Sequence, residues 1–271
     1  MKIFIDIGSH VGETLVEAAK EKYAFDKIVC FEPSMFCMDD LKKFSDKDNR
    51  ISICEFGLSN KNQDAELFQP GSLGGTIVTG ETHDVGKEHD PTFIDDRMVE
   101  KIKLRDANEW FEDNVSPDDY IVVKTNCEGS EVDILDSLID GKFMKNIYSF
   151  LITFDIREHK EFQHREMEIR KKLKSEGLTN YCFSDDVMIG HSHIERIANW
   201  LRLFGIDTED KNTVSLNQKY QKIFIKYSGK SGFFTRWEIR SKRMLDYKNF
   251  PTWIKKIFSF IKRTLGLNRE R

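Results

Sequence analysis

The chain has 271 residues, of which 39% are hydrophobic and 32% are charged, and its formal net charge is −4. This length suits one large domain, or one domain with an appendage, and the composition excludes the disordered and fibrous classes of protein. No apolar run is long enough to span a bilayer, so the sequence predicts no transmembrane helix.

The N-terminal MKIFIDIG enters a strand pattern with an acid at its sixth position, which is unlike a secretory signal peptide. The five cysteines are scattered, odd in number and without a C-x-x-C pair: Cys30, Cys37, Cys54, Cys127 and Cys182. This pattern is typical of reduced thiols rather than of disulfides or a zinc site. We therefore expect a cytoplasmic protein.

Short apolar segments alternate with helical patterns through the first two-thirds of the chain. Strands are predicted at 2–7, 27–32, 50–58, 120–126, 149–156 and 219–227. Helices are predicted at 12–22, 35–44, 107–115, 130–139 and 160–176. This alternation predicts an α/β fold, in which a mostly parallel sheet has helices on both faces. Ligands of such sheets bind at the carboxyl ends of the strands, near the point where the strand order reverses.

Two segments break the alternation. Residues 69–98 hold five of the sixteen glycines and show no clear period, which is typical of a lid or binding loop. Residues 229–271 carry 12 Lys or Arg and 3 Asp or Glu, so their net charge is +9 and that of the remaining 228 residues is −13. We therefore expect a main domain over 1–228 and a basic appendage over 229–271.

The appendage contains PTWIKKIFSFIKRTLGL (251–267), which places Trp, Ile and Phe on one helical face and Lys and Arg on the other. Pro251 fits a helix start. A basic amphipathic helix with aromatic residues fits an anionic membrane surface, which would hold the protein peripherally on the inner face of the membrane. Packing of the apolar face on the domain or on a partner helix is the alternative. Nucleic acid is a weaker partner because the body is acidic.

The first predicted strand runs into D-I-G-S-H-V-G, with Asp6, Gly8 and Gly12. The glycines let the backbone pass close to a ligand, and the following helix presents free N–H groups. The spacing differs from the dinucleotide fingerprint G-x-G-x-x-G, and the carboxylate suits a ligand that carries an amine. The second strand ends in Glu32, which can accept hydrogen bonds from both hydroxyls of a ribose. These features indicate a site for S-adenosylmethionine, and the alternative is a tight turn beside a solvated acid.

Four short blocks together carry a family resemblance. IDIGSHVGET, CFEPS, FGLSN and VVKTNCEGSE, in this order and spacing, resemble the FkbM-type methyltransferases, a class I S-adenosylmethionine-dependent family. Its members show D-[VI]-G-A-N-x-G, F-E-P, A-L-S and K-x-D-x-E-G-x-E. The resemblance spans about residues 3–156 and implies a Rossmann-like fold with a mostly parallel seven-stranded sheet, closed by the strand at 219–227. It also implies O-methyl transfer to hydroxyls of sugars or polyketide-like compounds.

Carried over position by position, the resemblance implies two sets of site residues. The cofactor would be bound by Asp6, Gly8, Ser9, His10, Gly12, Glu13, Thr14, Glu32, Pro33, Ser34, Leu58 and Ser59. The block after the fourth strand would supply Lys124, Asn126 and Glu128 to catalysis. The chain departs from the family at two places, with His10 where Asn is usual and Asn126 where Asp is usual. By its glycines and its family position, SLGGTIV (72–78) suits the hinge of a substrate lid.

The amide at Asn126 decides how the proton of a hydroxyl acceptor can leave. A sugar hydroxyl is a poor nucleophile, and a general base is worth ~10²–10⁴-fold. Asn126 cannot accept that proton, although it can orient the hydroxyl or the cofactor. The candidates for the base are Glu128, Lys124, Glu131 and His10. Our hypothesis is that Glu128 is the base and that Lys124 positions the acceptor oxygen. We interpret Glu131 as a first-turn helix acid, and an ion pair with a neighbouring Glu is an equal alternative for Lys124.

Other readings of the chain remain open. A nucleic-acid or protein methyltransferase is one alternative, and a cofactor-binding protein without catalysis is another, because Asn126 replaces the family Asp. The pairs His83-Asp84 and His89-Asp90 carry metal-ligating groups, as does His191-Ser192-His193, but their spacing matches no metal site. We therefore expect S-adenosylmethionine as cofactor, no metal, and a saccharide or another hydroxyl-bearing acceptor.

Overall fold

The computed structural model of the chain describes residues 1–78, 98–156, 161–184 and 193–207. The strand predicted at 219–227, the appendage at 229–271 with its amphipathic segment, and the boundary between the two predicted domains lie outside these residues. So do the pairs His83-Asp84 and His89-Asp90. No helix among the described residues is long and apolar enough to cross a membrane.

Six parallel strands form the main sheet of the described residues, in the spatial order β3-β2-β1-β7-β8-β9. They are β1 (Lys2–Ile7), β2 (Lys27–Phe31), β3 (Ile51–Cys54), β7 (Tyr120–Thr125), β8 (Ile147–Ile152) and β9 (Tyr181–Phe183). The central residues of β1, β2, β7 and β8 are buried, as expected of parallel strands covered on both faces, whereas those of the edge strand β3 are not. The strand order reverses between β1 and β7, and this is where open α/β sheets bind ligands.

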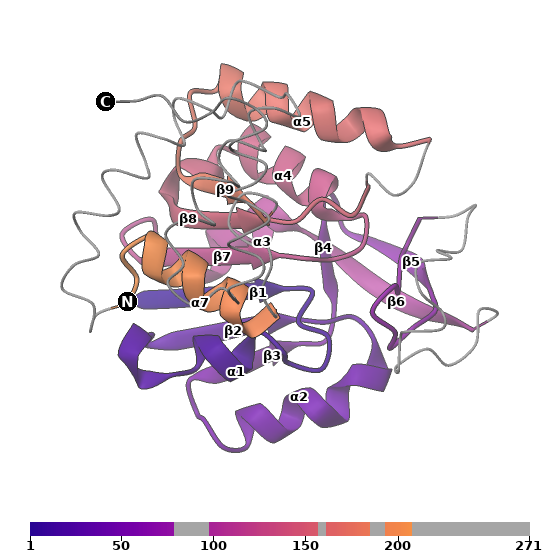
Figure 1. The fold of residues 1–271 in the computed structure, drawn as a ribbon. Helices are drawn as coiled ribbons and strands as arrows, with labels where there is room; N and C mark the ends of the chain where they lie inside the picture. Colours follow the sequence, from indigo (N-terminus) through magenta and orange to yellow (C-terminus); the bar gives the residue numbers. More distant parts are fainter. Residues whose placement is uncertain (79–97, 157–160, 185–192, 208–271) are drawn as a thin grey trace, which may run out of the picture. The chain divides into compact units, whose positions relative to one another are not determined.

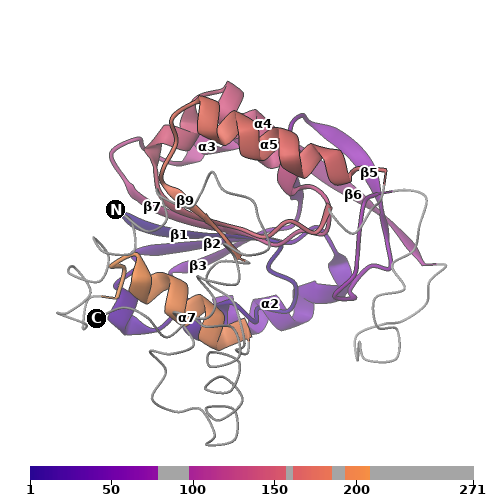
Figure 2. The ribbon, with the colours of Figure 1, turned by 45° about the horizontal axis from the view of Figure 1, so that its top comes forward.

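Helices cover both faces of this sheet (Figures 1 and 2). One face carries α3 (Ala107–Asn114), α4 (Glu131–Asp140) and α5 (Gln163–Ser175), and the other carries α1 (Leu15–Ala18), α2 (Met38–Ser45) and α7 (His193–Leu203). Short 3-10 turns lie at η1 (Glu21–Tyr23), η2 (Met35–Cys37) and η3 (Phe143–Asn146).

Alternate strand residues divide between two hydrophobic cores. Ile3 and Ile5 pack toward α3, α4 and α5, whereas Phe4 packs toward α1, α2 and α7. This division follows from the two-residue period of a strand, which sends successive side chains to opposite faces. The predicted α/β, Rossmann-like architecture with helices on both faces is confirmed for the described residues.

A second, three-stranded sheet was not predicted. It consists of β4 (Gly57–Ser59), β5 (Gln63–Phe68) and β6 (Val99–Asp106), with β6 parallel to β4 and antiparallel to β5. The prediction of one strand over 50–58 is therefore wrong, because the chain leaves the main sheet after Cys54 and enters the second sheet at Gly57. The segment predicted as a glycine-rich loop begins as a tight reversal after β5, where Phe68 pairs with Thr76.

Candidate active site

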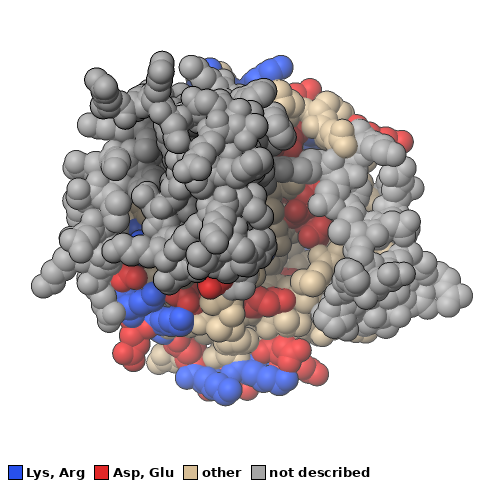
Figure 3. All heavy atoms as spheres, viewed as in Figure 1, with Lys and Arg blue, Asp and Glu red and all other residues tan. Residues whose placement is uncertain are grey.

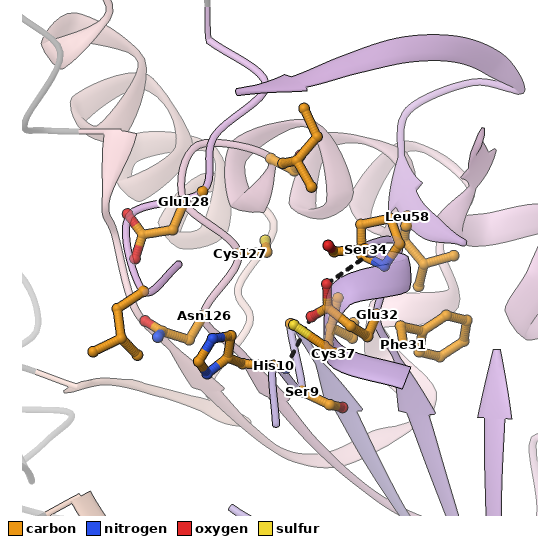
Figure 4. A pocket seen from close by; sticks show the side chains of 18 of the residues that line it. Ser9, His10, Phe31, Glu32, Ser34, Cys37, Leu58, Asn126, Cys127 and Glu128 are labelled. Carbon is orange, nitrogen blue, oxygen red and sulfur yellow. Dashed lines mark hydrogen bonds between the residues drawn. The ribbon is translucent and has the colours of Figure 1, made fainter. Parts of the chain in front are cut away.

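A cavity of about 390 Å³ opens at the carboxyl ends of β1, β2 and β7 (Figure 4). This volume lies within the range of small-molecule sites. Twelve of the fifteen residues predicted from the sequence line the cavity, and the exceptions are Asp6, Gly12 and Ser59. The structure thus brings together residues that are up to 120 positions apart, from Gly8 to Glu128.

The turn after β1 packs directly against the turn after β7. Gly8 has φ +77°, and a Cβ atom on it would lie 2.0 Å from the carbonyl oxygen of Asn126. The backbone N–H of Asn126 in turn donates to the carbonyl of Ile7 at 3.0 Å. A side chain at position 8 would therefore separate the two turns. Glycine is required at this position both by its conformation and by the space available.

Glu32 follows β2 and is held by the backbone. Its two carboxylate oxygens accept hydrogen bonds from the N–H groups of His10 and Ser34, each at 2.9 Å (Figure 4). The side chain is 8% exposed, and burial raises the pKa of Glu32 while the two N–H donors oppose that rise. Each oxygen keeps a further acceptor site. Glu32 is therefore fixed at the cavity with the capacity to accept hydrogen bonds from two ligand hydroxyls.

His10 connects the glycine turn to the segment after β5. Its Nδ1 lies 2.8 Å from Oε1 of Glu13 and its Nε2 lies 3.0 Å from the carbonyl oxygen of Gly71. Both partners only accept hydrogen bonds, so this arrangement requires a hydrogen on each ring nitrogen. Burial favours the neutral ring, but Glu13 and the Gly71 carbonyl outweigh it and raise the pKa of His10.

Lys124 forms a buried ion pair with Asp6 rather than with a neighbouring Glu. Its Nζ lies 2.9 Å from Oδ1 of Asp6 and also donates to the carbonyl of Gly8 at 2.9 Å. Asp6 is fully buried behind the cavity wall, and burial raises its pKa against the opposing charge of Lys124. Direct contact of the cofactor with any of the predicted residues stays a prediction, and Asp6, Gly12 and Ser59 do not line the cavity.

The acids that follow β7 have different positions. Glu131 is fully buried, and its oxygens accept from the N–H groups of Gly129 at 2.8 Å and Ile156 at 2.6 Å. It organises backbone and does not line the cavity, which supports our non-catalytic interpretation. Glu128 and Asn126 are half-buried and line the cavity. Figure 4 shows them on one side of it, with Ser34 and Leu58 on the other.

An apolar end of the cavity is formed by the two sheets together. Leu58 of β4 lines it with Phe31, which ends β2, and with Ile102 and Leu104 of β6. Leu58, Ile102 and Leu104 are at most 5% exposed. Such a surface suits the flat face of an aromatic base. The part played by β6 was missed because that strand was not predicted.

The segment 72–78 lies beside the cavity, where the sequence placed a lid hinge. Ser72, Leu73 and Gly75 line the cavity. The hydroxyl of Thr76 donates to the carbonyl of Glu128 at 2.6 Å, which ties the segment to the turn after β7. Movement of this segment stays a prediction.

Two further cavity residues, His193 and Arg196, come from α7. The sequence pattern drew attention to His193 only as a possible metal ligand and did not indicate Arg196. His193 forms a hydrogen bond with the hydroxyl of Thr14, with Nε2 and Oγ1 3.0 Å apart. Burial, followed by the charges of Lys124 and Arg196, lowers the pKa of His193 to about 4. Arg196 lines the cavity one helical turn further on. The apolar spacing of Ile197, Trp200, Leu201 and Phe204 could have revealed the helix, but not which face meets the cavity.

Comparisons with known proteins found little. No protein-family model matches the chain, and no curated protein matches it. Among solved structures, the crystal structure of methyltransferase FkbM from Methylobacillus flagellatus KT is similar, with 16% sequence identity and a TM-score of 0.30. The match covers 52% of this chain and 29% of that one. A match of this extent does not establish a family or an activity for the chain.

Proposed function

We propose that the chain is an S-adenosylmethionine-dependent methyltransferase that transfers a methyl group to a hydroxyl oxygen of a saccharide or glycan precursor. The observation that carries this proposal is Glu32, held by two backbone N–H groups on the wall of a cavity that also contains the Gly8 turn. This arrangement suits a ligand with a ribose, an aromatic base and an amino acid part.

The residues present fit that cofactor in three respects. Because Gly8 has no Cβ atom, the turn after β1 packs directly against the turn after β7, and both turns line the cavity in which the cofactor would bind. The carboxylate of Glu32 would accept hydrogen bonds from the ribose hydroxyls, and the apolar end of the cavity around Leu58 would accommodate the adenine. When bound, S-adenosylmethionine supplies a methyl group on a sulfonium, whose transfer requires mainly in-line placement of the acceptor oxygen.

We assign Glu128 as the general base that accepts the proton of the acceptor hydroxyl. Its carboxylate can accept a proton, whereas Asn126 beside it can only orient the hydroxyl or the cofactor. His10 is less suited to this role because both of its ring nitrogens are engaged. Lys124 contributes mainly by holding the carbonyl of Gly8 and the charge of Asp6, and one of its N–H groups remains for the acceptor oxygen.

Cofactor binding is tested by calorimetry with S-adenosylhomocysteine on the wild-type chain and on the Glu32→Gln variant. Loss of hydrogen bonds to a charged group is expected to weaken binding about 10–100-fold. The matched control is Glu100→Gln. Glu100 accepts from the hydroxyl of Ser34 and the N–H of Met35 beside the same turn but does not line the cavity. Equal affinity of the Glu32→Gln variant and the wild type contradicts the assigned cofactor site.

Transfer is tested with S-adenosylmethionine labelled at its methyl group, on separate pools of glycan, RNA and protein acceptors. Label in the glycan pool that alkaline ester hydrolysis does not remove supports an O-methyl ether. Label in RNA or protein alone would replace the saccharide with one of those acceptor classes. Binding of S-adenosylhomocysteine without transfer to any pool would favour a cofactor-binding protein that lacks catalysis.

A further inference from the structure

Arg196 is a cationic residue of the cavity wall that the proposed chemistry does not use. It lies in the first turn of α7, three residues after His193, so the two side chains share a helical face. α7 is anchored on the sheet by Ile197, Trp200 and Leu201, which are fully buried, and the indole N–H of Trp200 donates to the hydroxyl of Ser149 at 3.2 Å. The guanidinium is therefore carried to the cavity by a packed helix.

The side chain of Arg196 lacks an acceptor among the described residues. Its Nε is buried and has no hydrogen-bond partner in that part of the chain. A buried donor without a partner is costly, and a guanidinium keeps its charge at every physiological pH. Its planar arrangement of N–H groups matches the two oxygens of a carboxylate or phosphate.

The neighbouring cations differ from Arg196 in having anionic partners. Lys124 is paired with Asp6, and His10 is paired with Glu13. His193, which lines the cavity from the same turn of α7, is neutral near pH 7 because its pKa is lowered to about 4. Among the described cavity residues, Arg196 thus supplies a positive charge without a carboxylate partner.

We propose that Arg196 is the anion-binding residue of this cavity and that it takes a carboxylate or phosphate group of a ligand bound there. The assignment of the ligand rests on the proposed function, under which two ligands can supply that anionic group. One source is the carboxylate in the amino acid part of the cofactor. The other is an acidic group on the acceptor, which would restrict the acceptors to acidic saccharides such as uronates or sugar phosphates.

The two sources are separated by calorimetry with four probes on the wild type and on Arg196→Gln and Arg196→Lys. S-adenosylhomocysteine has the carboxylate, whereas 5′-methylthioadenosine lacks the whole amino acid part. D-glucuronate and inorganic phosphate represent an acidic acceptor. Arg202→Gln is the matched control, because it removes the same charge from the same helix at a position that does not line the cavity.

If the cofactor supplies the anion, Arg196→Gln weakens S-adenosylhomocysteine about 10–100-fold and leaves 5′-methylthioadenosine within about threefold, with partial recovery in Arg196→Lys. If the acceptor supplies it, both nucleosides bind unchanged and the binding of D-glucuronate or phosphate is lost. Either result supports the proposal, provided that Arg202→Gln behaves like the wild type.

Equal affinities of Arg196→Gln and the wild type for all four probes overturn the proposal. A parallel loss of both nucleosides also overturns it, because that result indicates a structural role for Arg196. Failure of the proposed function gives a different result. The wild type would then bind neither nucleoside, yet loss of D-glucuronate or phosphate binding in Arg196→Gln would still uphold the anion site.

Discussion

The turns after β1 and β7 are neighbours at the switch point of the sheet, yet they use their polar residues differently. The turn after β1 directs His10, Glu13 and Thr14 to the cavity wall. The residues after β7 have two different roles. Glu131 accepts hydrogen bonds from backbone N–H groups, whereas Asn126 and Glu128 line the cavity. A dense run of charged residues in the sequence therefore contains structural as well as cavity-facing groups.

Both turns also contain a non-glycine residue with positive φ, at His10 (48°) and Glu128 (49°). This region of backbone conformation is sparsely populated by such residues, and surrounding contacts must hold them there. His10 is held by Glu32 and Gly71, and Glu128 is held through its carbonyl by Thr76. Each turn therefore contains one non-glycine residue with positive φ, but the side chains of the two turns have different roles.

Separation of the two turns should destabilise the fold more than any other change considered for this site. Gly8→Ala places a methyl group against the carbonyl of Asn126, and backbone cannot rotate away as a side chain can. We expect a loss of about 3 kcal/mol or more in the free energy of unfolding, or failure to fold. The measurement is urea denaturation.

Gly177→Ala is the control for that variant. Gly177 has φ +67° and nothing within 4 Å of its Cβ position, so alanine there meets only the conformational cost of about 1–2 kcal/mol. If the two variants were equally stable, direct contact between the turns would not be what requires glycine at position 8.

An intermediate effect is expected from exchanging single oxygens for N–H₂ groups in the block after β7. In Glu131→Gln the amide N–H₂ would face a buried backbone N–H that now donates to a carboxylate oxygen. This loss is expected to lower the free energy of unfolding by about 1–3 kcal/mol.

Glu128→Gln is expected to lower turnover about 10²–10⁴-fold with a smaller loss in the free energy of unfolding. Urea denaturation and methyl-transfer rates of both variants test whether Glu131 has a structural role and Glu128 a catalytic one. A Glu128→Gln variant with full turnover, or a fully stable Glu131→Gln variant, would contradict this division of roles.

The smallest effects concern the two cavity histidines, whose pKa values are shifted in opposite directions. His193 has a folded pKa of about 4, below its ordinary 6.5, so the unfolded chain takes up its proton first as the pH falls. The wild type should therefore lose about 1–2 kcal/mol of stability through His193 between pH 6.5 and pH 5. His193→Gln should remove that loss in urea denaturation at the two pH values.

His10 has the opposite sign because its pKa is raised in the folded chain. Its stabilising contribution is complete below its unfolded pKa of 6.5 and is lost as the pH rises through the higher folded value. His10→Gln should therefore cost more stability at pH 5 than at pH 8. A cost that does not change with pH would show that His10 is not charged in its contacts with Glu13 and Gly71.

The sequence alone predicted the α/β class, with a parallel sheet between two layers of helices, and most of the residues that line the cavity. Strands and helices have different periods of apolar residues, so their alternation can be recognised in the sequence. The carboxyl ends of parallel strands meet at one edge of the sheet. The sequence therefore predicts that Gly8, Glu32 and Glu128 lie close together at this edge. The second sheet was missed because only one face of β6 is apolar, with Ile102 and Leu104 between charged residues.

Tertiary structure alone decided which groups are partners. Lys124 and Asp6 are 118 positions apart, and Thr14 and His193 are 179 apart, so no local pattern reports either contact. Sequence periodicity fixes the face on which a side chain lies, but the neighbour on that face depends on how the strands and helices pack. That packing made Glu131 a structural residue and carried Arg196 to the cavity, because burial and hydrogen-bond partners are properties of the folded chain and not of its segments.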